Sequence, residues 1–348
     1  MVRAAELVGI ACIAAIALSA CGSGGATATD DPSARERRHD ALVRAKVFRS
    51  GFRPEVLAPR PAPPLDCRFL LTDVSGTTPK FDCELADGRL VKVKYGRTPE
   101  ISGEIAATRL LNALGFGADE VRLASRVRCY GCPVSPFYSR VLKGTHLEAL
   151  LRRTMNYDEF REYEWTAVED RLDAAAIAAA GEEGWGFYEL KQIDAARGGA
   201  TAHEVDALRL MAVFLAHWDN KARNQRLVCL SPIEPDGRCE RPLVMLQDVG
   251  ATFGPRKVNL SAWRDTPIWM APQGCGVSME NFPHDGATFR EVTLSDGGRR
   301  LLVDRLIKLS PAHLRTLFLE AKFPGDVEEW VNVFRQRIDE IAARTCES

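Results

Sequence analysis

The stretch His217-Trp-Asp-Asn-Lys-Ala-Arg-Asn224 is the most informative part of this sequence for fold and function. Its start overlaps the end of a helix predicted at 203–218, which is apolar nearly all round from Leu208 to Leu215 and is therefore expected to be buried. A second apolar segment, 243–247, is expected to be a strand and runs into Asp248-Val-Gly250. Carboxylates and an amide at the ends of buried elements are the groups that bind a cation or accept a proton.

A basic strand and a further carboxylate lie earlier in the chain. In Val91-Lys-Val-Lys94, strand alternation puts both lysines on one face. Glu104 falls inside the apolar stripe of a predicted helix, 102–114, rather than opposite it. Because a buried carboxylate is costly without a cation, we expect Glu104 to pair with Lys94. The alternatives are two solvated lysines and a glutamate at the edge of the stripe.

Taken in chain order, these segments resemble the motifs of the protein kinase superfamily. The 91–94 strand is similar to the kinase V-A-I-K strand, and residues 217–224 are similar to the catalytic loop H-R-D-L-K-x-x-N. Asp248-Val-Gly250 resembles the metal-binding D-F-G motif. The Asp-x4-Asn spacing also fits phosphatidylinositol-kinase-like and HipA-like enzymes.

The resemblance implies an α+β, two-lobed protein-kinase-like fold, with a small β-rich N-lobe carrying one helix and a larger, mostly helical C-lobe. The pattern of the chain agrees with this layout. Strands are expected at 67–73, 80–85, 89–95, 121–128, 137–142, 225–229 and 243–247, and helices at 102–114, 146–155, 163–180, 203–218, from Pro311 and from about 326 to 344.

Three departures point to an atypical branch of that superfamily. No Gly-x-Gly-x-x-Gly precedes Lys94, and only Ser75-Gly76 stands in the first hairpin. Trp218 replaces the arginine of the catalytic loop, and no Ala-Pro-Glu follows Asp248. These features suit the HipA-like, phosphatidylinositol-kinase-like or secretory-pathway kinases, the last of which are also disulfide-bonded.

The resemblance also implies a role for each motif residue, with ATP or another nucleotide and Mg²⁺ or Mn²⁺ as cofactors. The nucleotide-binding residues would be Lys94, which binds the α/β-phosphates, and Glu104, which orients Lys94. The catalytic residues would be Asp219, as proton acceptor, and Lys221, near the γ-phosphate. The metal ligands would be Asn224 and Asp248.

The resulting expectation is a membrane-anchored, extracytoplasmic phosphotransferase whose acceptor is an unknown envelope or extracellular molecule. One alternative is a pseudokinase that keeps the fold as a binding or scaffold lipoprotein. A second is nucleotidyl transfer on the same fold, and a third is an unrelated structural lipoprotein of the envelope. Only the third leaves the order of the motifs unexplained.

The N-terminus indicates export. An uncharged apolar run, 7–18, has the length of a signal-peptide core and leads into Leu18-Ser-Ala-Cys21. This ending resembles a bacterial lipobox, which implies that Cys21 is lipidated; an ordinary cleaved signal peptide is the alternative. We expect a signal peptide at 1–20, a flexible Gly/Ser then Pro-rich linker at 21–65, the N-lobe at 66–144 and the C-lobe at 145–348.

Ten cysteines fit an oxidising compartment. Cys12 would leave with the signal peptide and Cys21 would carry lipid. The other eight are disulfide candidates, and pairing neighbours gives Cys67–Cys83, Cys129–Cys132, Cys229–Cys239 and, by elimination, Cys275–Cys346. Sequence alone does not fix this connectivity, and Cys129-Tyr-Gly-Cys132 also has the spacing of a redox motif or half a zinc site.

Charge and composition limit the partners. The 46 Lys and Arg nearly balance the 47 Asp and Glu, for a net charge of −1, so no global positive field exists to attract nucleic acid. Hydrophobic residues make up 46% of the chain and charged residues 27%, as in an ordinary globular protein. The expected partners are a nucleotide, the acceptor, and a membrane through the lipid anchor.

Overall fold

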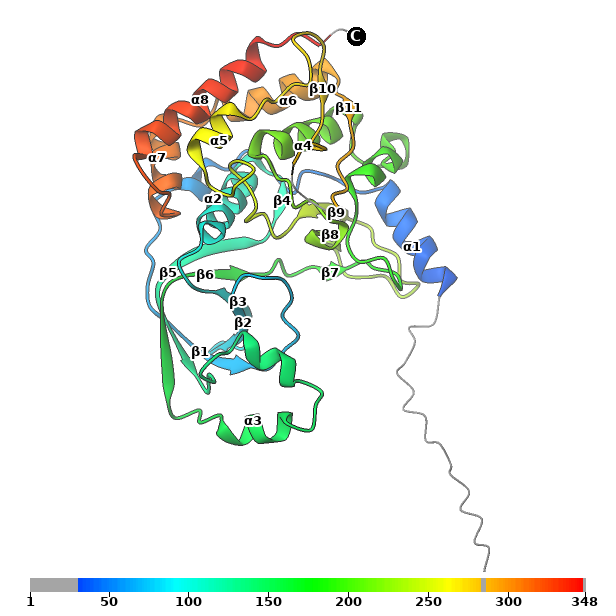
Figure 1. The fold of residues 1–348 in the computed structure, drawn as a ribbon. Coiled ribbons are helices and arrows are strands. Elements are labelled where there is room, and N and C mark those ends of the chain that lie inside the picture. The colour runs from blue at the N-terminus through cyan, green and yellow to red at the C-terminus, as the bar shows by residue number, and fades with distance from the viewer. Residues whose placement is uncertain (1–30, 283–285, 347–348) are drawn as a thin grey trace, which may run out of the picture.

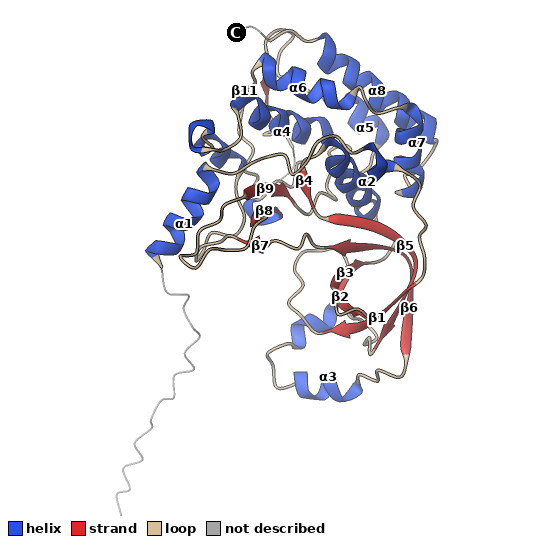
Figure 2. Cartoon of the chain, turned by 180° about the vertical axis from the view of Figure 1, so that it is seen from behind, coloured by secondary structure: helices blue, strands red, loops and turns tan. Residues whose placement is uncertain are grey.

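The protein is described from a computed structural model, which covers residues 31–282 and 286–346. It is a mixed α and β structure. Figures 1 and 2 view it from opposite sides, and in both a group of curved strands lies at one end and α4 to α8 lie at the other. Helix α2 (Pro99–Leu114) lies between them. The signal peptide, Cys21 and the first part of the expected linker fall outside the described residues.

The strand group is a closed barrel in the order β1-β2-β3-β6-β5. Its strands are β1 (Leu65–Leu70), β2 (Lys80–Leu85), β3 (Leu90–Lys94), β6 (Phe160–Asp170) and β5 (Glu120–Tyr130). Neighbours are antiparallel except β1 and β5, which are parallel. Alternate residues, among them Phe69, Phe81, Val93 and Val168, fill the interior, as the period-two pattern of each strand requires.

Helix α2 is held at both ends and is buried on most sides. The Thr98 side chain accepts the backbone N–H of Glu100, Pro99 occupies the first turn, and Gly115 ends the helix with φ of 87°. A Cβ at Gly115 would lie 2.3 Å from the carbonyl oxygen of Ser50, so glycine is required there for close approach as well as for its backbone angle.

The helical end is built around a second sheet, in the order β4-β9-β8-β7. The strands are β4 (Gly117–Ala118), β7 (Ala175–Ala176), β8 (Gln225–Cys229) and β9 (Pro242–Leu246), with a separate pair β10 (Gly276–Val277) and β11 (Val292–Thr293). The helices are α1 (Pro32–Val43), α4 (Ala202–Leu215), α5 (Leu260–Asp265), α6 (Asp296–Leu306), α7 (Pro311–Glu320) and α8 (Val327–Ala343). Short 3-10 turns are η1 (Pro54–Leu57), η3 (Phe187–Gln192), η4 (Ala195–Arg197) and η5 (Ala222–Asn224).

Most expected elements are present, but two are wrong. Residues 137–142 form a 3-10 turn, η2 (Tyr138–Leu142), rather than a strand. The helix expected at 163–180 is instead the end of β6, followed by the short β7. Because β6 pairs with both β3 and β5, the barrel continues to Asp170, beyond residue 144 where the β-rich part was expected to end. The division into domains stays a prediction.

Part of the expected linker is also wrong. Residues 32–57 are not a flexible tether but contain α1 and η1, and Leu42, Ala45, Val47 and Leu57 are buried in the main core. The backbone of Lys46 hydrogen-bonds with residues 242 and 244 beside β9. Because these contacts join residues that are far apart in the sequence, no local sequence pattern predicts them.

Four disulfides lie within the described residues, and they are the four expected pairs. Their Cα atoms are 5.2 to 5.6 Å apart. Cys129–Cys132 is therefore a disulfide here, and the one cluster with metal-ligand spacing that the described residues contain, Cys67, Cys83 and Cys129, has all its sulfurs in such bonds. Such pairs are consistent with an extracytoplasmic protein.

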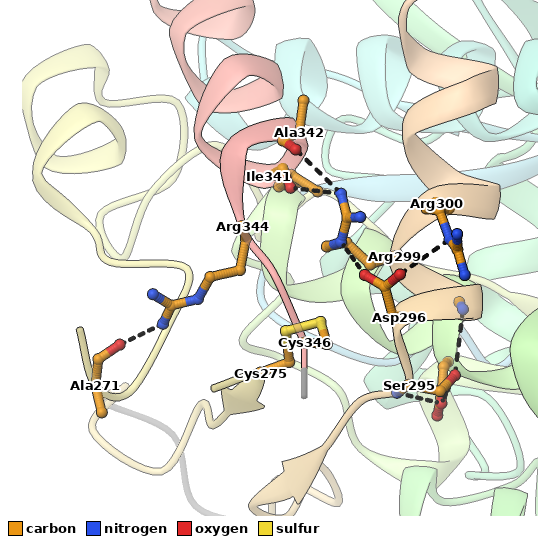
Figure 3. The surroundings of a disulfide bond; sticks show 12 residues. Ala271, Cys275, Ser295, Asp296, Arg299, Arg300, Ile341, Ala342, Arg344 and Cys346 are labelled. Atoms are coloured by element: carbon orange, nitrogen blue, oxygen red, sulfur yellow. Dashed lines mark hydrogen bonds and ion pairs between the residues drawn. A yellow bond between two sulfur atoms is a disulfide. The ribbon is translucent and has the colours of Figure 1, made fainter. Parts of the chain in front are cut away.

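Figure 3 shows the Cys275–Cys346 disulfide, which fastens the end of the chain. Beside it, Arg344 donates to the carbonyl oxygen of Ala271, and Arg299 donates to the carbonyl oxygens of Ile341 and Ala342 at 3.2 Å each. The C-terminal turn is thus tied to the rest of the protein by covalent and polar contacts. Across residues 31–282 and 286–346, none of the helices combines the length and the apolarity that crossing a membrane requires.

Candidate functional site

A cavity of about 380 Å³ lies between the barrel and two loops, the one that leads into β8 and the one that follows β9. Its walls include five of the residues singled out from the sequence: Lys94, Asp219, Lys221, Asn224 and Asp248. They come from the end of β3, the loop after α4, η5 and the loop after β9. The sixth, Glu104, lies behind Lys94 on α2. The structure therefore brings together residues from four separate points of the chain.

The expected pairing of Lys94 with Glu104 is confirmed. The Lys94 Nζ lies 2.5 and 2.6 Å from the two carboxylate oxygens of Glu104. Each residue is only 1% exposed. The alternation of the strand predicted the direction of the Lys94 side chain, and the apolar stripe of the helix predicted that of Glu104. Both side chains point into the same buried region, where they form the ion pair.

Lys94 also contacts two further carboxylates. Its Nζ lies 3.2 Å from Asp248 Oδ1 and 3.8 Å from Glu169 Oε2. Burial lowers the pKa of Lys94, but Glu104, Asp248 and Glu169 outweigh it and hold this pKa well above its usual value. The ammonium therefore stays charged throughout the ordinary pH range.

The pKa values of Glu104 and Asp248 are shifted in opposite directions by these surroundings. Burial raises the pKa of Glu104, and Asp248 and Glu169 add to this against the effect of Lys94. Burial also raises the pKa of Asp248, but Lys94 and Lys80 outweigh it and hold that pKa well below its usual range. Asp248, which lines the cavity, is thus the group kept ionised, while Glu104 behind it is the group that is costly to ionise.

The loop at 217–221 is fixed by buried polar contacts. After α4 ends, Ala216 turns the chain with φ of 52°, and the fully buried His217 ring lies 3.1 Å from the Gln225 side chain. Burial lowers the pKa of His217 to about 4, so the ring is neutral near pH 7. The Asn220 Oδ1 accepts the backbone N–H groups of Thr288 and Phe289, at 2.7 and 2.9 Å.

These contacts place the three polar residues of the loop. The Asn224 Nδ2 donates to the backbone oxygen of Asp219 at 2.7 Å, and Lys221 Nζ lies 3.4 Å from Asp219 Oδ1. The Asp219 and Lys221 side chains keep 28% and 26% of their surface accessible, so both can be reached from the cavity.

The Asp-x-Gly turn packs directly on the first turns of α2. A Cβ at Gly250 would lie 2.4 Å from Glu100 Cγ, and one at Gly103 would lie 2.7 Å from the Gly250 oxygen. Neither glycine can carry a side chain without displacing the other segment. The helix that bears Glu104 and the turn that bears Asp248 are therefore in close backbone contact.

The residues present fit a hard divalent cation. The Asn224 amide donates an N–H to the Asp219 carbonyl oxygen, which leaves the amide oxygen of Asn224 available as a ligand. Asp248 supplies an ionised carboxylate in the same cavity. Oxygen donors of this kind suit Mg²⁺ or Mn²⁺ rather than a thiophilic metal.

Several charged residues of the cavity were not predicted, and Glu169 and Lys80 lie nearest to the predicted set. Glu169 lies on β6, inside the segment misread as a helix, and contacts Lys92 at 3.2 Å. Lys80 was assigned to its strand, but its place in the cavity was not noticed. The signal was available, because a hairpin turning at Ala86-Asp-Gly88 puts Lys80 directly opposite Lys94, as observed.

Comparisons with known proteins give distant structural likenesses. No family model and no curated protein matches the sequence. Among solved structures, the chain is similar to the crystal structure of a proinflammatory kinase, CtkA, from Helicobacter pylori. That likeness has 12% identity and a TM-score of 0.41 and covers 81% of this chain and 95% of the other. We base no assignment on so distant a likeness.

Proposed function

We propose that this chain is an atypical kinase-like phosphotransferase that uses ATP or another nucleotide with Mg²⁺ or Mn²⁺. The observation that carries the proposal is the convergence of Lys94, Asp219, Lys221, Asn224 and Asp248 on one cavity. Phosphoryl transfer depends mainly on positioned charge, and this set supplies cations, a carboxylate base and oxygen ligands. In this proposal the barrel with α2 is the small lobe and the helical end is the large one.

Each side chain would have one task. Lys94, held by Glu104, would bind the α- and β-phosphates. Asp219 would accept the proton of an acceptor hydroxyl as its oxygen bonds to the γ-phosphorus and the bond from that phosphorus to the diphosphate oxygen breaks. Lys221, beside Asp219, would neutralise charge on the transferred group. The products are a phosphorylated acceptor and the nucleoside diphosphate.

Asn224 and Asp248 would hold the divalent cation. A cation bound there supplies charge neutralisation on the phosphates. Asp248 contacts Lys94 at 3.2 Å, so the same carboxylate orients the lysine and completes the cation site. This arrangement explains why the Asp-x-Gly turn is packed so closely on α2.

A pseudokinase is the second candidate, and one observation favours it. In the loop over the cavity between β1 and β2, Gly76 is the one glycine where kinases commonly have several. Backbone contacts to phosphate would then be fewer. Such a protein would bind a nucleotide or a partner without transferring phosphate.

The test compares the purified mature protein with Asp219→Asn and Asp248→Ala, using labelled ATP, Mg²⁺ or Mn²⁺ and an envelope extract. Asp219→Asn is expected to reduce transfer by about 10²- to 10⁴-fold while nucleotide affinity changes little. Asp248→Ala is expected to weaken the metal-dependent binding itself. Label carried over from the γ but not the α position identifies a kinase, and the reverse identifies nucleotidyl transfer. Nucleotide binding without transfer supports the pseudokinase.

We also propose that the protein is exported and lipid-anchored through Cys21. The four disulfides support export, and the lipobox-like residues before Cys21 support the anchor. Cys21→Ser is expected to move the protein from the membrane fraction to the soluble exported fraction. Fractionation and immunoblotting measure this, and unchanged membrane retention would exclude Cys21 as the anchor.

A further inference from the structure

Lys80 is a buried cation in the wall of the cavity. It begins β2, lies directly opposite Lys94 on β3, and is 5% exposed. Two like charges placed opposite one another in a sheet are destabilising. Burial, and then the charge of Lys94, lower the pKa of Lys80, and the opposing effects of Asp248 and Glu104 do not reverse this. The fold therefore carries a cost at this position that its own packing does not explain.

The other lysines of the cavity each have a carboxylate partner. Lys92 contacts Glu169 at 3.2 Å, Lys221 contacts Asp219 at 3.4 Å, and Lys257 is paired with Glu100. Lys80 has no hydrogen bond or ion pair with any residue in 31–282 or 286–346. A buried ammonium that faces a cavity without an anion of its own is prepared for an anion from outside.

The loop above Lys80 is shaped to its ammonium group. A Cβ at Gly76 would lie 3.2 Å from Lys80 Nζ, and Gly76 has φ of 86°, so the bare backbone of the loop passes directly over the charge. The loop is held from behind, because the Arg140 guanidinium donates to the carbonyl oxygens of Val74 and Gly76 at 3.0 and 3.3 Å. Lys143 contacts Asp73 of the same loop at 2.5 Å.

We propose that Lys80 and the loop at 75–77 form a subsite for the terminal phosphate of a nucleoside triphosphate. This inference rests on the proposed function and adds to it the part of the ligand that Lys94 does not bind. A side-chain ammonium under a short loop replaces the cradle of backbone N–H groups that a glycine-rich loop would supply. It makes the cavity selective for a triphosphate over a diphosphate.

The test measures the affinities of the full mature protein for ATP and ADP by calorimetry, with Mn²⁺ present. Lys80→Met is expected to weaken ATP binding about tenfold or more, the usual size for a lost charge-assisted contact. ADP binding is expected to change much less, so the preference for ATP over ADP falls. Lys80→Arg restores part of that preference.

Lys92→Met is the matched control. Lys92 lines the same cavity from the neighbouring strand but is already paired with Glu169. The ATP-to-ADP preference of this variant is expected to stay near that of the wild type. A Lys80→Met protein with an unchanged preference overturns the subsite and leaves the proposed function standing. A wild type that binds neither nucleotide, with Mg²⁺ or Mn²⁺, overturns both.

A second measurement needs no variant, in case Lys80→Met does not fold. The wild type is treated with acetic anhydride, and acetylation of Lys80 is followed by mass spectrometry without nucleotide, with ADP and with ATP. ATP is expected to protect Lys80 severalfold more than ADP does. Equal protection by the two nucleotides overturns the subsite.

Discussion

Two buried clusters of charged side chains, one around Arg38 and one around Lys94, differ in where they lie and in what surrounds them. On α1, Arg38 donates to both carboxylate oxygens of Glu189 at 3.0 and 3.1 Å and to the Gly184 carbonyl at 2.8 Å. Glu189 in turn accepts the backbone N–H of Gly186 at 2.7 Å. In the cavity, Lys94 meets three carboxylates, and one of them, Asp248, keeps 36% of its side chain accessible.

The difference separates structural from functional burial of charge. Around Arg38 both carboxylates come from one segment, Glu182 and Glu189, and the cluster joins α1 to that segment without lining the cavity. Around Lys94 the three carboxylates include Asp248, which lines the cavity, and Lys80 nearby has no hydrogen bond or ion pair among the described residues. Under the proposed function, a bound nucleotide would supply the anion that the described residues do not offer Lys80.

The largest expected effect is on the cavity cluster. Lys94→Met is expected to reduce phosphate transfer by roughly 10²- to 10³-fold, because a fixed charge at the reacting group is lost. It is also expected to abolish the rise in melting temperature that ATP and Mn²⁺ produce in the wild type. Transfer assays and calorimetry measure the two effects. A variant that kept both would show that Lys94 only stabilises the fold.

The second expected effect is on the structural cluster. Arg38→Met leaves the Glu189 carboxylate buried without its cation, so the free energy of unfolding is expected to fall by about 3 kcal/mol or more. Arg35→Met, on the exposed side of the same helix, is the control and is expected to change it by about 0.5 kcal/mol or less. Denaturant unfolding measures both.

Nucleotide binding by folded Arg38→Met is expected to match that of the wild type. The comparison between the two clusters breaks down if this variant loses nucleotide affinity at a temperature where it is folded.

The smallest expected effect is the pH dependence due to His217. In the unfolded chain a histidine binds its proton near pH 6.5, whereas burial lowers the pKa of folded His217 to about 4. Between these values the unfolded state binds more protons, so stability rises with pH. The contribution is complete above pH 6.5 and is lost as pH falls to 4, for a total of about 3 kcal/mol.

His217→Gln is expected to flatten this part of the stability curve while keeping a polar contact with Gln225. Urea unfolding at a series of pH values measures the slope. Equal slopes for wild type and variant between pH 4 and 6.5 would show that His217 takes up its proton alike in the folded and unfolded chains.

The sequence predicted the parts of the site whose signals are local. Lys94 and Glu104 lie on a clear strand and a clear helix, and each could be oriented from its own periodicity. The loop 217–224 was recognised from its resemblance to the kinase catalytic loop, together with its position after an apolar helix. Their meeting in one cavity needed only the correct order of elements along the chain.

The parts that were missed depend on distant partners. A helix was predicted at 163–180, although pairing with β3 and β5 makes residues 160–170 a strand and brings Glu169 into the cavity. Helix α1 has apolar residues mainly in its last turn, and contacts near residues 189 and 243 decide that it is buried. Tertiary contacts of this kind override local propensity.

The Cys275–Cys346 bond has a consequence for the chain before it folds. Its sequence separation of 71 residues makes the C-terminal part, with α6, α7 and α8, a covalent ring, whereas Cys129–Cys132 spans only 3. By loop-closure entropy the larger ring removes about 4 kcal/mol of freedom from the unfolded chain, against under about 2 kcal/mol for the small one. Loss of the Cys275–Cys346 bond to a thiol reductant is therefore expected to cost the whole fold more stability than loss of Cys129–Cys132.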